Sequence, residues 1–201
     1  MNVRRSVPSA IILASASPRR KELLEQIGIA ATIVPSKVDE TRIRHDDPVH
    51  LAISLARAKA LDVAESVGRV PRDDPDPTVR PILGADTLVV VAGIILEKPA
   101  GRDDAARMLR LLSGRTHQVI TGVAVIPGAG SIRSAHAESH VTFAQLTEPE
   151  IDTCLESREW LGVAGAYRIQ GIAARYITHL SGSYSNVVGL PLHLVYSILT
   201  A

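Results

Sequence analysis

The sequence predicts an α/β protein in which helices flank a mixed, twisted sheet. Short apolar runs that suit strands alternate along the chain with segments whose apolar residues recur at helical spacing. Several neighbouring strands are separated only by tight turns, which makes them antiparallel and the sheet mixed rather than purely parallel. The chain has 201 residues, 46% of them hydrophobic and 21% charged, so we expect residues 1–201 to form one globular domain.

The first third of the chain is predicted to run strand, helix, strand, helix. The apolar residues 11–14 suit a buried strand. The Ser-Pro pair at 17–18 supplies an N-cap and a proline at the first helical position, and Gly28 ends that helix. Residues 29–34 form the next strand. The Asp-Pro pair at 47–48 repeats the cap-and-proline signal, so a second helix begins there.

Residues 67–81 are predicted to be a mobile surface loop. The segment holds four prolines and several charges, and such a composition buries too little apolar surface to order itself. No pattern on either side shows a separate core. We therefore do not interpret the segment as a linker between domains.

The rest of the chain alternates strands and helices in the same way. Residues 82–91 form the most apolar strand, and an Ala-Gly turn joins it to a hairpin partner at 94–96. A capping box at Thr147 and Glu150 predicts the start of a helix. The other predicted helices cover 103–112 and 191–200, and the other predicted strands cover 117–126, 132–146, 163–170 and 172–177.

Charge and composition exclude several classes of partner. Lys and Arg (22) nearly balance Asp and Glu (21), and aromatic residues make up 3%, so neither a bulk positive field nor a base-stacking platform favours nucleic acid. No apolar run reaches the roughly 18 residues that a membrane span needs. The single cysteine, Cys154, excludes an intramolecular disulfide. We expect a cytoplasmic protein with no nucleic-acid or membrane partner.

Asp86, inside the apolar run ILGADTLVVV, is the residue that most strongly suggests chemistry. An ionised carboxylate in a buried strand is costly unless a cation or hydrogen bonds compensate it. Two interpretations are open. Asp86 is either a carboxylate that binds a metal or activates water, or an aspartate at a strand bulge beside Gly84.

The segment SASPRR, residues 15–20, has the features of an anion site. It places two hydroxyls and two guanidiniums at a helix N-terminus, where unpaired N–H groups and the helix dipole favour a negative charge. Because arginines in a first turn oppose the dipole, the pattern suggests that a bound anion supplies the missing charge. The alternative is a solvated arginine pair. Lys59 and Lys98 are equally compatible with ordinary solvent-facing side chains.

Seven ordered blocks of the sequence resemble the Maf family of nucleoside triphosphate pyrophosphatases. They are LASASPRRKELL, VDE, LARAKA, ILGADTLVV, EKPAGRDDAARMLRLLSGRTHQVITGV, AGAYRIQG and GSYSNVVGLPL. The Ala-Asp-Thr and Ile-Gln-Gly blocks resemble the branch that acts on dTTP and UTP rather than the branch that acts on 7-methyl-GTP. The resemblance implies an inosine-triphosphatase-like (Maf) fold. It also implies a hydrolase that cleaves the α–β phosphoanhydride and releases a nucleoside monophosphate and pyrophosphate.

The resemblance also implies a role for individual residues. Asp86 would be the general base for water, and Glu40 would share with it a divalent cation, Mg²⁺ or Mn²⁺. The implied phosphate-binding residues are Ser15, Ser17, Arg20, Lys59 and Lys98. The implied base-selecting residues are Arg19, Thr87 and Gln170. The family further implies a homodimer, and the proline-rich segment 67–81 departs from its pattern.

Two alternatives to this function stay open at the level of sequence. The same hydrolytic machinery can prefer another nucleotide, such as CTP or a modified pyrimidine nucleotide. A protein of another class, a nucleotide-binding regulator of septum formation and cell division with slow hydrolysis, fits the same motifs. The carboxylates at 40 and 86 argue for turnover, because a pure binder needs no buried water-activating group. The enzymatic interpretation requires residues 20, 59 and 98 to converge on the polyphosphate that residues 40 and 86 face.

Overall fold

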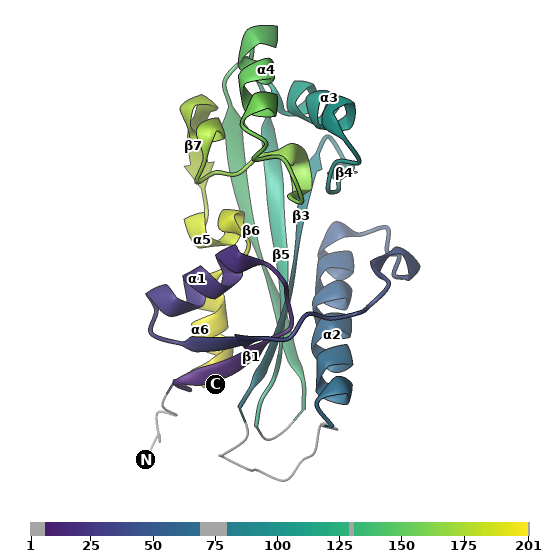
Figure 1. The fold of residues 1–201 in the computed structure, drawn as a ribbon, viewed down its shortest axis with the longest axis vertical. Coiled ribbons are helices and arrows are strands. Elements are labelled where there is room, and N and C mark those ends of the chain that lie inside the picture. Colours follow the sequence, from purple (N-terminus) through teal and green to yellow (C-terminus); the bar gives the residue numbers. More distant parts are fainter. Residues whose placement is uncertain (1–6, 69–79, 129–130, 201) are drawn as a thin grey trace. The chain divides into compact units, whose positions relative to one another are not determined.

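The computed structural model describes residues 7–68, 80–128 and 131–200 (Figure 1). Most of the predicted loop, residues 69–79, lies outside this range. The chain divides into two compact units that we describe separately: Met1–Asp86, Thr121–Ala137 and Gly189–Ala201 form the first, and Thr87–Ile120 and Glu138–Val188 form the second. The chain passes between them four times, at residues 86–87, 120–121, 137–138 and 188–189. The expectation of a single domain stays a prediction.

A seven-stranded mixed sheet runs through the structure in the order β2-β1-β3-β5-β6-β7, with β4 also paired to β3. Its strands are β1 (Ala10–Leu13), β2 (Ala30–Ile33), β3 (Ile82–Val91), β4 (Ile94–Leu96), β5 (Thr116–Ile126), β6 (Arg133–Phe143) and β7 (Ile177–Ser181). β1 pairs parallel with both β2 and β3, whereas β4 pairs antiparallel with β3 and β7 with β6. The predicted mixed α/β class is therefore confirmed.

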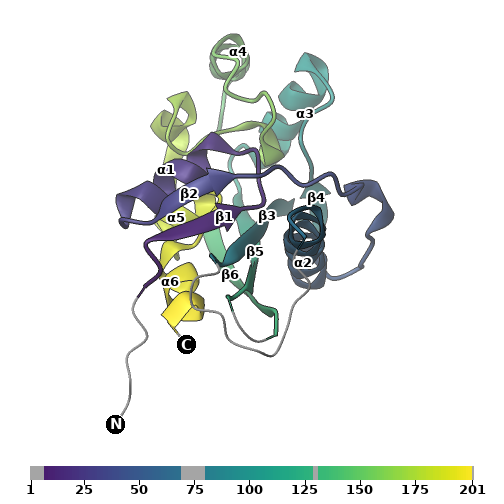
Figure 2. The ribbon, with the colours of Figure 1, turned by 60° about the horizontal axis from the view of Figure 1, so that its bottom comes forward.

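In the first unit, helices cover both faces of the sheet. The helical elements are α1 (Pro18–Gln26), η1 (Glu40–Arg42), α2 (Pro48–Ser66) and α6 (Leu192–Thr200). α2 lies on one face and α6 on the other (Figures 1 and 2). Proline stands in the first turn of both α1 and α2, and the Asp47 carboxylate accepts the Val49 N–H at 2.7 Å. The cap-and-proline signals in the sequence thus mark both helix starts.

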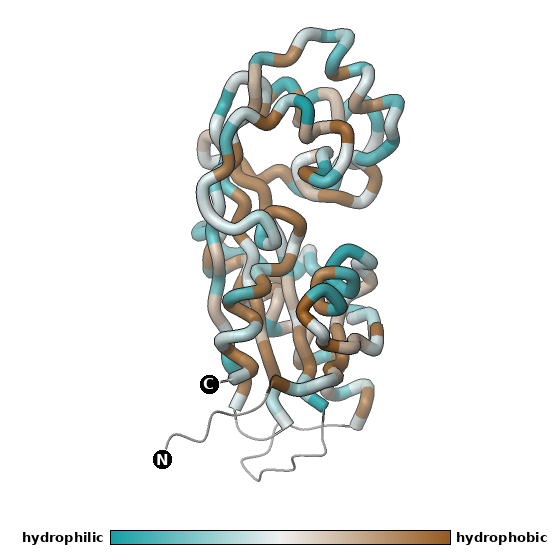
Figure 3. Tube along the Cα trace, turned by 90° about the vertical axis from the view of Figure 1, so that its left-hand side faces the viewer, coloured by the Kyte–Doolittle hydropathy of each residue, from teal (hydrophilic) through white to brown (hydrophobic). Residues whose placement is uncertain are grey.

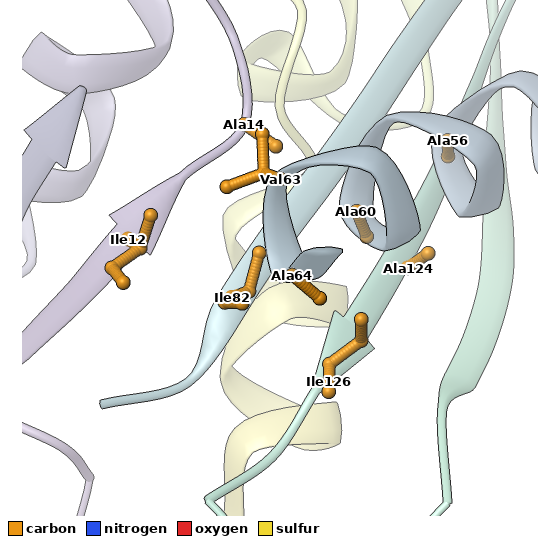
Figure 4. Packing of buried hydrophobic residues seen from close by; sticks show 9 residues of the cluster. All are labelled: Ile12, Ala14, Ala56, Ala60, Val63, Ala64, Ile82, Ala124 and Ile126. Atoms are coloured by element: carbon orange, nitrogen blue, oxygen red, sulfur yellow. The ribbon is translucent and has the colours of Figure 1, made fainter. Parts of the chain in front are cut away.

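The core under α2 is built for a close approach of the helix to the sheet. Small side chains of α2 meet apolar side chains of β1, β3 and β5 in a buried cluster (Figure 4). A Cβ added to Gly84 in β3 would overlap the backbone oxygen of Ala56, and one added to Gly122 in β5 would overlap that of Ala52. Because both strands carry glycine where the helix backbone crosses them, α2 packs directly on the strand backbones.

In the second unit, α3 (Arg102–Leu112) and α4 (Glu148–Glu156) pack against each other. Arg110 pairs with Glu148 at 2.7 Å and Arg102 with Glu156 at 2.9 Å. The predicted capping box is present, since the Glu150 carboxylate accepts the Thr147 N–H at 2.7 Å. The remaining elements of this unit are η2 (Ala164–Ala166), η3 (Ile172–Tyr176) and α5 (Tyr184–Val188).

The strands predicted at 163–170 and 172–177 are wrong. These residues form η2, a turn and η3, and a strand begins only at Ile177. Gly165 and Ala166 adopt positive φ angles of 72° and 62°, which a strand does not allow. Val163, Ile169 and Ala173 in this segment are buried, but burial alone does not distinguish a strand from an irregular segment of the core. Helix α5 was not predicted.

Hydropathy differs from strand to strand. β3 is apolar along most of its length, whereas β6 mixes hydrophobic residues with charged and polar ones. Hydrophobic and hydrophilic residues are interspersed along the chain (Figure 3). Cys154 is buried in α4, as expected of a small core residue. None of the helices that the structure describes is both long enough and apolar enough to cross a membrane.

Candidate functional site

The carboxylate of Asp86 is compensated by a lysine. Asp86 lies within β3 with 7% of its surface exposed, and its Oδ1 accepts a hydrogen bond from Lys59 Nζ at 2.6 Å. The same ammonium lies 2.9 Å from Oε1 of Glu40. One cation from α2 therefore joins two carboxylates that come from β3 and η1. Lys59 is itself 9% exposed, so it is not the solvent-facing side chain that the sequence alone allowed.

The close packing of α2 on β3 places this lysine. Gly84 and Asp86 are two residues apart in a strand, so they face the same side of the sheet. Gly84 meets the α2 backbone at Ala56 and Ala60. Lys59 is on the same helix face as Ala56, one turn away. Gly84, which allows α2 to pack closely on β3, thus also sets the Lys59–Asp86 distance. Its role is in helix packing rather than in a turn.

Glu40 contacts Lys59 from the short helix η1, which is ordered by the preceding residue, Asp39. The Asp39 carboxylate caps η1 by accepting the Thr41 N–H at 3.1 Å and the Thr41 hydroxyl at 2.6 Å. The Glu40 side chain is 43% exposed. Of the two carboxylates on Lys59, Glu40 is therefore the one that faces solvent, while Asp86 is enclosed.

Arg20 is buried, so the interpretation as a solvated arginine is wrong for this residue. Its Nε donates to the Gly189 carbonyl at 2.8 Å, and its Nη1 donates to the Ala85 carbonyl at 2.8 Å and to Ser15 Oγ at 3.0 Å. Burial lowers the pKa of the Arg20 guanidinium, and the nearby Asp86 and Glu40 carboxylates oppose that shift. Arg20 thus fixes the peptide that precedes Asp86 and adds positive charge beside it.

The hydroxyl group of Ser15 accepts two hydrogen bonds, and its proton is left to donate one. Its Oγ accepts the Ser17 N–H at 3.2 Å and the Arg20 guanidinium at 3.0 Å. A hydroxyl has two acceptor lone pairs and one donor, so both lone pairs are engaged. Within the described residues the Ser15 proton has no acceptor, and it is available to an anionic ligand.

The start of α1 has the character of an anion site. Ser17 is the N-cap, yet among the residues that the structure describes its side chain makes no capping hydrogen bond. The first turn contains no acidic residue, and Arg19 there is partly buried. The positive end of the helix dipole is therefore joined by two arginines, and its first turn contains no acidic residue.

Three of the predicted site residues belong to the second unit. Thr87 follows Asp86 in β3 and is partly buried, whereas Lys98, after β4, and Gln170, in the turn before η3, are exposed. The structure brings together Ser15, Arg20, Glu40, Lys59 and Asp86 in the first unit, with Ser17 beside them. That Lys98 converges on the same polyphosphate stays a prediction.

Two carboxylates are the donor set that this site offers to a metal ion. Across residues 7–68, 80–128 and 131–200, no group of three or more His, Cys, Asp or Glu side chains is arranged to hold one. Glu40 and Asp86 nevertheless already meet at one cation, the Lys59 ammonium. Mg²⁺ is commonly bound by one or two carboxylates together with substrate phosphates and water. The residues present fit such a shared ion.

Sequence reasoning missed the carbonyl acceptors of Arg20. Ala85 O and Gly189 O receive two of its hydrogen bonds, and a backbone carbonyl has no signature in the sequence. The available hint was the glycine-punctuated segment GSYSNVVGLPL, in which Gly189 has a φ of 126°. That angle lies in the region that favours glycine, and the carbonyl of the same residue accepts the hydrogen bond from Arg20 Nε.

Comparisons with known proteins agree with the motifs. The family described as "Maf-like protein" matches residues 10–201. A "dTTP/UTP pyrophosphatase" of Chelativorans sp. (strain BNC1) is 43% identical over 197 residues, 98% of this chain and 92% of the relative. The proteins of that name from Symbiobacterium thermophilum and Moorella thermoacetica are 47% and 46% identical, covering 94% and 95% of this chain and 92% and 94% of theirs. A solved HAM1 protein from Coxiella burnetii aligns at a TM-score of 0.40 and 19% identity, over 68% of this chain and 74% of that one.

Proposed function

This chain belongs to the Maf family, and from that premise we propose that it hydrolyses dTTP and UTP to the nucleoside monophosphate and pyrophosphate. The observation that carries the proposal is the buried Asp86 carboxylate, held by Lys59 and flanked by Glu40 and Arg20. The names of the relatives support the choice of substrates. A nucleotide regulator without turnover would have no use for an enclosed carboxylate held in this way.

The proposed chemical step begins with a water molecule at Asp86. Oδ1 of Asp86 is engaged by Lys59, so we assign Oδ2 as the oxygen that accepts the proton of the water. The water oxygen forms a bond to the α-phosphorus, and the bond from that phosphorus to the α–β bridging oxygen breaks. Pyrophosphate leaves with the bridging oxygen and its electron pair. The proton passes from Asp86 to solvent, which restores the carboxylate.

Phosphate binding is the role we propose for the cationic and hydroxyl groups. A triphosphate is strongly anionic, and its cleavage depends mainly on positioning and charge neutralisation. Ser15 offers its free proton, Ser17 an uncommitted hydroxyl at the start of α1, and Arg20 its charge. Lys59 and Lys98 supply further positive charge. Arg20 has a second role here, because it also fixes the carbonyl of Ala85 before the general base.

Glu40 and Asp86 are the residues we propose to hold a divalent cation, Mg²⁺ or Mn²⁺. When bound, such an ion neutralises phosphate charge and polarises the phosphoryl group. The exposed Glu40 carboxylate is the one that can rearrange, whereas the enclosed Asp86 keeps its place.

Base selection is proposed for Gln170, with Arg19 and Thr87. The glutamine amide carries both a donor and an acceptor, so it can pair with the adjacent carbonyl and N–H of uracil or thymine. Gln170 is exposed, as a residue that meets a ligand must be before binding. A cytosine ring presents an amino donor where uracil has a carbonyl acceptor, and the same amide orientation does not suit both.

Product analysis tests this proposal. The protein is incubated with UTP, dTTP, CTP and GTP in the presence of Mg²⁺ and, separately, Mn²⁺, and the products are resolved by anion exchange. We expect UMP or dTMP and pyrophosphate in equal amounts, with UTP and dTTP preferred. Release of a single phosphate from the γ position contradicts the proposal. Tight nucleotide binding without turnover contradicts it equally and favours a regulatory protein.

A further inference from the structure

The exposed Gln170 projects from a turn with a firmly anchored backbone. The Gly171 N–H donates to the Arg168 carbonyl at 3.1 Å, which closes a turn over residues 168–171. Ile169, within that turn, is only 8% exposed, whereas the next residue, Gln170, points to solvent. Ile169 therefore fixes the N-terminal side of the turn in the core.

A distant carboxylate fixes the other side. Oε2 of Glu159 accepts the Ile172 N–H at 2.7 Å, across 13 residues of chain. Ile172 begins η3, and the preceding Gly171 is an N-cap with no side chain to offer. Glu159 thus satisfies an N–H group that an N-cap side chain would otherwise bind.

Gly171 leaves the space that this carboxylate occupies. A Cβ built on Gly171 would overlap both Oε2 and Cδ of Glu159. The peptide groups of Gly171 are fully used as well, because its carbonyl accepts the Ala174 N–H at 3.0 Å. A side chain at 171 therefore displaces the Glu159 carboxylate and breaks its hydrogen bond to Ile172.

Glu159 is itself held against the end of α4. Its N–H donates to Ser157 Oγ at 3.2 Å, and the Ser157 hydroxyl donates to the Cys154 carbonyl at 2.7 Å. On the other side, Trp160 Nε1 donates to the Leu155 carbonyl at 2.9 Å. The segment that carries Glu159 is therefore tied to the end of α4 on both sides, by the Ser157 hydroxyl and by the Trp160 indole.

We propose that Glu159 is a positioning residue for base selection, and that it acts by holding the Gly171–Ile172 peptide and through it the Gln170 amide. The inference rests on the proposed function, because it takes Gln170 as the residue that pairs with the base. Discrimination by hydrogen bonds depends on the direction of donor and acceptor. Without the Glu159 carboxylate, the turn over residues 168–171 loses the contact that orients its C-terminal side. The selectivity for the base then falls more than the rate of turnover does.

The test compares kcat/KM for UTP with that for CTP. Glu159→Ala is expected to lower the UTP-to-CTP ratio about tenfold, with pyrophosphate still the product. Glu159→Gln is expected to keep most of the ratio, because its amide oxygen accepts the same hydrogen bond. Glu156→Ala is the matched control. It removes a glutamate three residues earlier that pairs with Arg102 at 2.9 Å, and we expect an unchanged ratio.

A double-mutant cycle separates this mechanism from general loosening of the fold. Gly171→Ala is expected to lower the ratio as Glu159→Ala does, since it displaces the same carboxylate. In the Glu159→Ala background, Gly171→Ala is then expected to add little. Gly171→Ala also provides an independent route if Glu159→Ala does not fold. Hydrogen exchange of the Ile172 amide is expected to speed up in both single variants and to stay slow in Glu156→Ala.

Gln170→Ala distinguishes failure of this inference from failure of the proposed function. If Gln170→Ala keeps the wild-type ratio, Gln170 does not read the base, and both its proposed role and that of Glu159 are wrong. If Gln170→Ala lowers the ratio and folded Glu159→Ala does not, only the inference about Glu159 is overturned. Strictly additive losses in the double variant also overturn it.

Discussion

Lys59 Nζ lies 2.6 Å from Oδ1 of Asp86, and both residues are less than a tenth exposed. Asp86 enters from the middle of β3 and Lys59 from α2, which packs on that strand through Gly84. The pair is therefore both a structural contact between helix and sheet and the centre of the proposed chemistry. Substitutions at the two residues are expected to separate these functions.

Asp86→Asn is expected to remove turnover and leave the fold in place. Asparagine keeps the size of aspartate and can still accept a hydrogen bond from Lys59, but it does not accept the proton of the attacking water. General-base catalysis is typically worth about 10²- to 10⁴-fold, and we expect a loss of kcat in that range. Steady-state kinetics beside a thermal melt checks this, and an unchanged kcat would show that Asp86 is not the base.

Lys59→Met is expected to destabilise the protein as well as inactivate it. The substitution leaves Asp86 as a buried charge without its cation, and removing one partner of a buried ion pair costs about 3–5 kcal/mol. Urea unfolding measures the cost. Lys21→Met is the matched control, since Lys21 pairs with Glu25 at 3.4 Å on the surface, where a pair contributes about 1 kcal/mol or less. Equal losses in the two variants would contradict a buried Lys59–Asp86 pair.

Gly84→Ala is expected to lower both stability and activity, because the added methyl group overlaps the Ala56 carbonyl and lies 2.9 Å from the Ala60 nitrogen. Those atoms are backbone, so α2 has to shift as a whole, and overpacking of this kind costs about 1–3 kcal/mol. Gly101→Ala is the control, since nothing lies within 4 Å of a Cβ at that position. Activity retained in Gly84→Ala would show that the position of α2 on β3 is not critical.

His117 is expected to make the second unit sensitive to acid. It is buried against Phe143 and Tyr167, its Nε2 lies 2.8 Å from the Tyr167 hydroxyl, and within the described residues its Nδ1 has no hydrogen-bond partner. Burial lowers the pKa of His117 from 6.5 to about 4. In the unfolded chain the imidazole takes up a proton below pH 6.5, and in the folded protein it does so only near pH 4.

The free energy of unfolding that depends on a neutral His117 is therefore fully present above about pH 6.5. It falls as the pH drops toward 4, by on the order of 3 kcal/mol in total. Urea unfolding at a series of pH values measures this slope. His117→Gln is expected to flatten the slope although the variant is less stable at pH 7. The exposed His136→Gln is the control and keeps the wild-type slope. A slope that persists in His117→Gln would assign the acid sensitivity to other groups.

Local signals predicted most of the fold because they act over a few residues. The proline and capping patterns before residues 18, 48 and 148 mark real helix starts, and the uninterrupted apolar run 82–91 is β3. The prediction for segment 163–177 was wrong because buried apolar residues such as Ile169 and Ala173 do not form a strand there. The positive φ angles at 165 and 166 depend on tertiary contacts. One of these contacts is visible at Gly165, where a Cβ would lie 2.9 Å from a Val89 methyl group.

The sequence predicted which chemical groups form the candidate site, but not which residues contact each other there. An aspartate within an apolar strand requires compensation on physical grounds alone, but only the structure identifies Lys59 as the compensating group. The burial of Arg20 was not predictable, because it depends on the carbonyls of Ala85 and Gly189. Nothing in the sequence links Glu159 to Ile172. The homodimer, the cytoplasmic location and the divalent cation stay predictions.

Hydrolysis of UTP in ¹⁸O-labelled water tests the central claim most directly, because the label marks the phosphorus atom that the water attacks. If the water at Asp86 attacks the α-phosphorus, mass spectrometry finds one ¹⁸O in UMP and none in the pyrophosphate. A label in pyrophosphate or in inorganic phosphate would contradict the account.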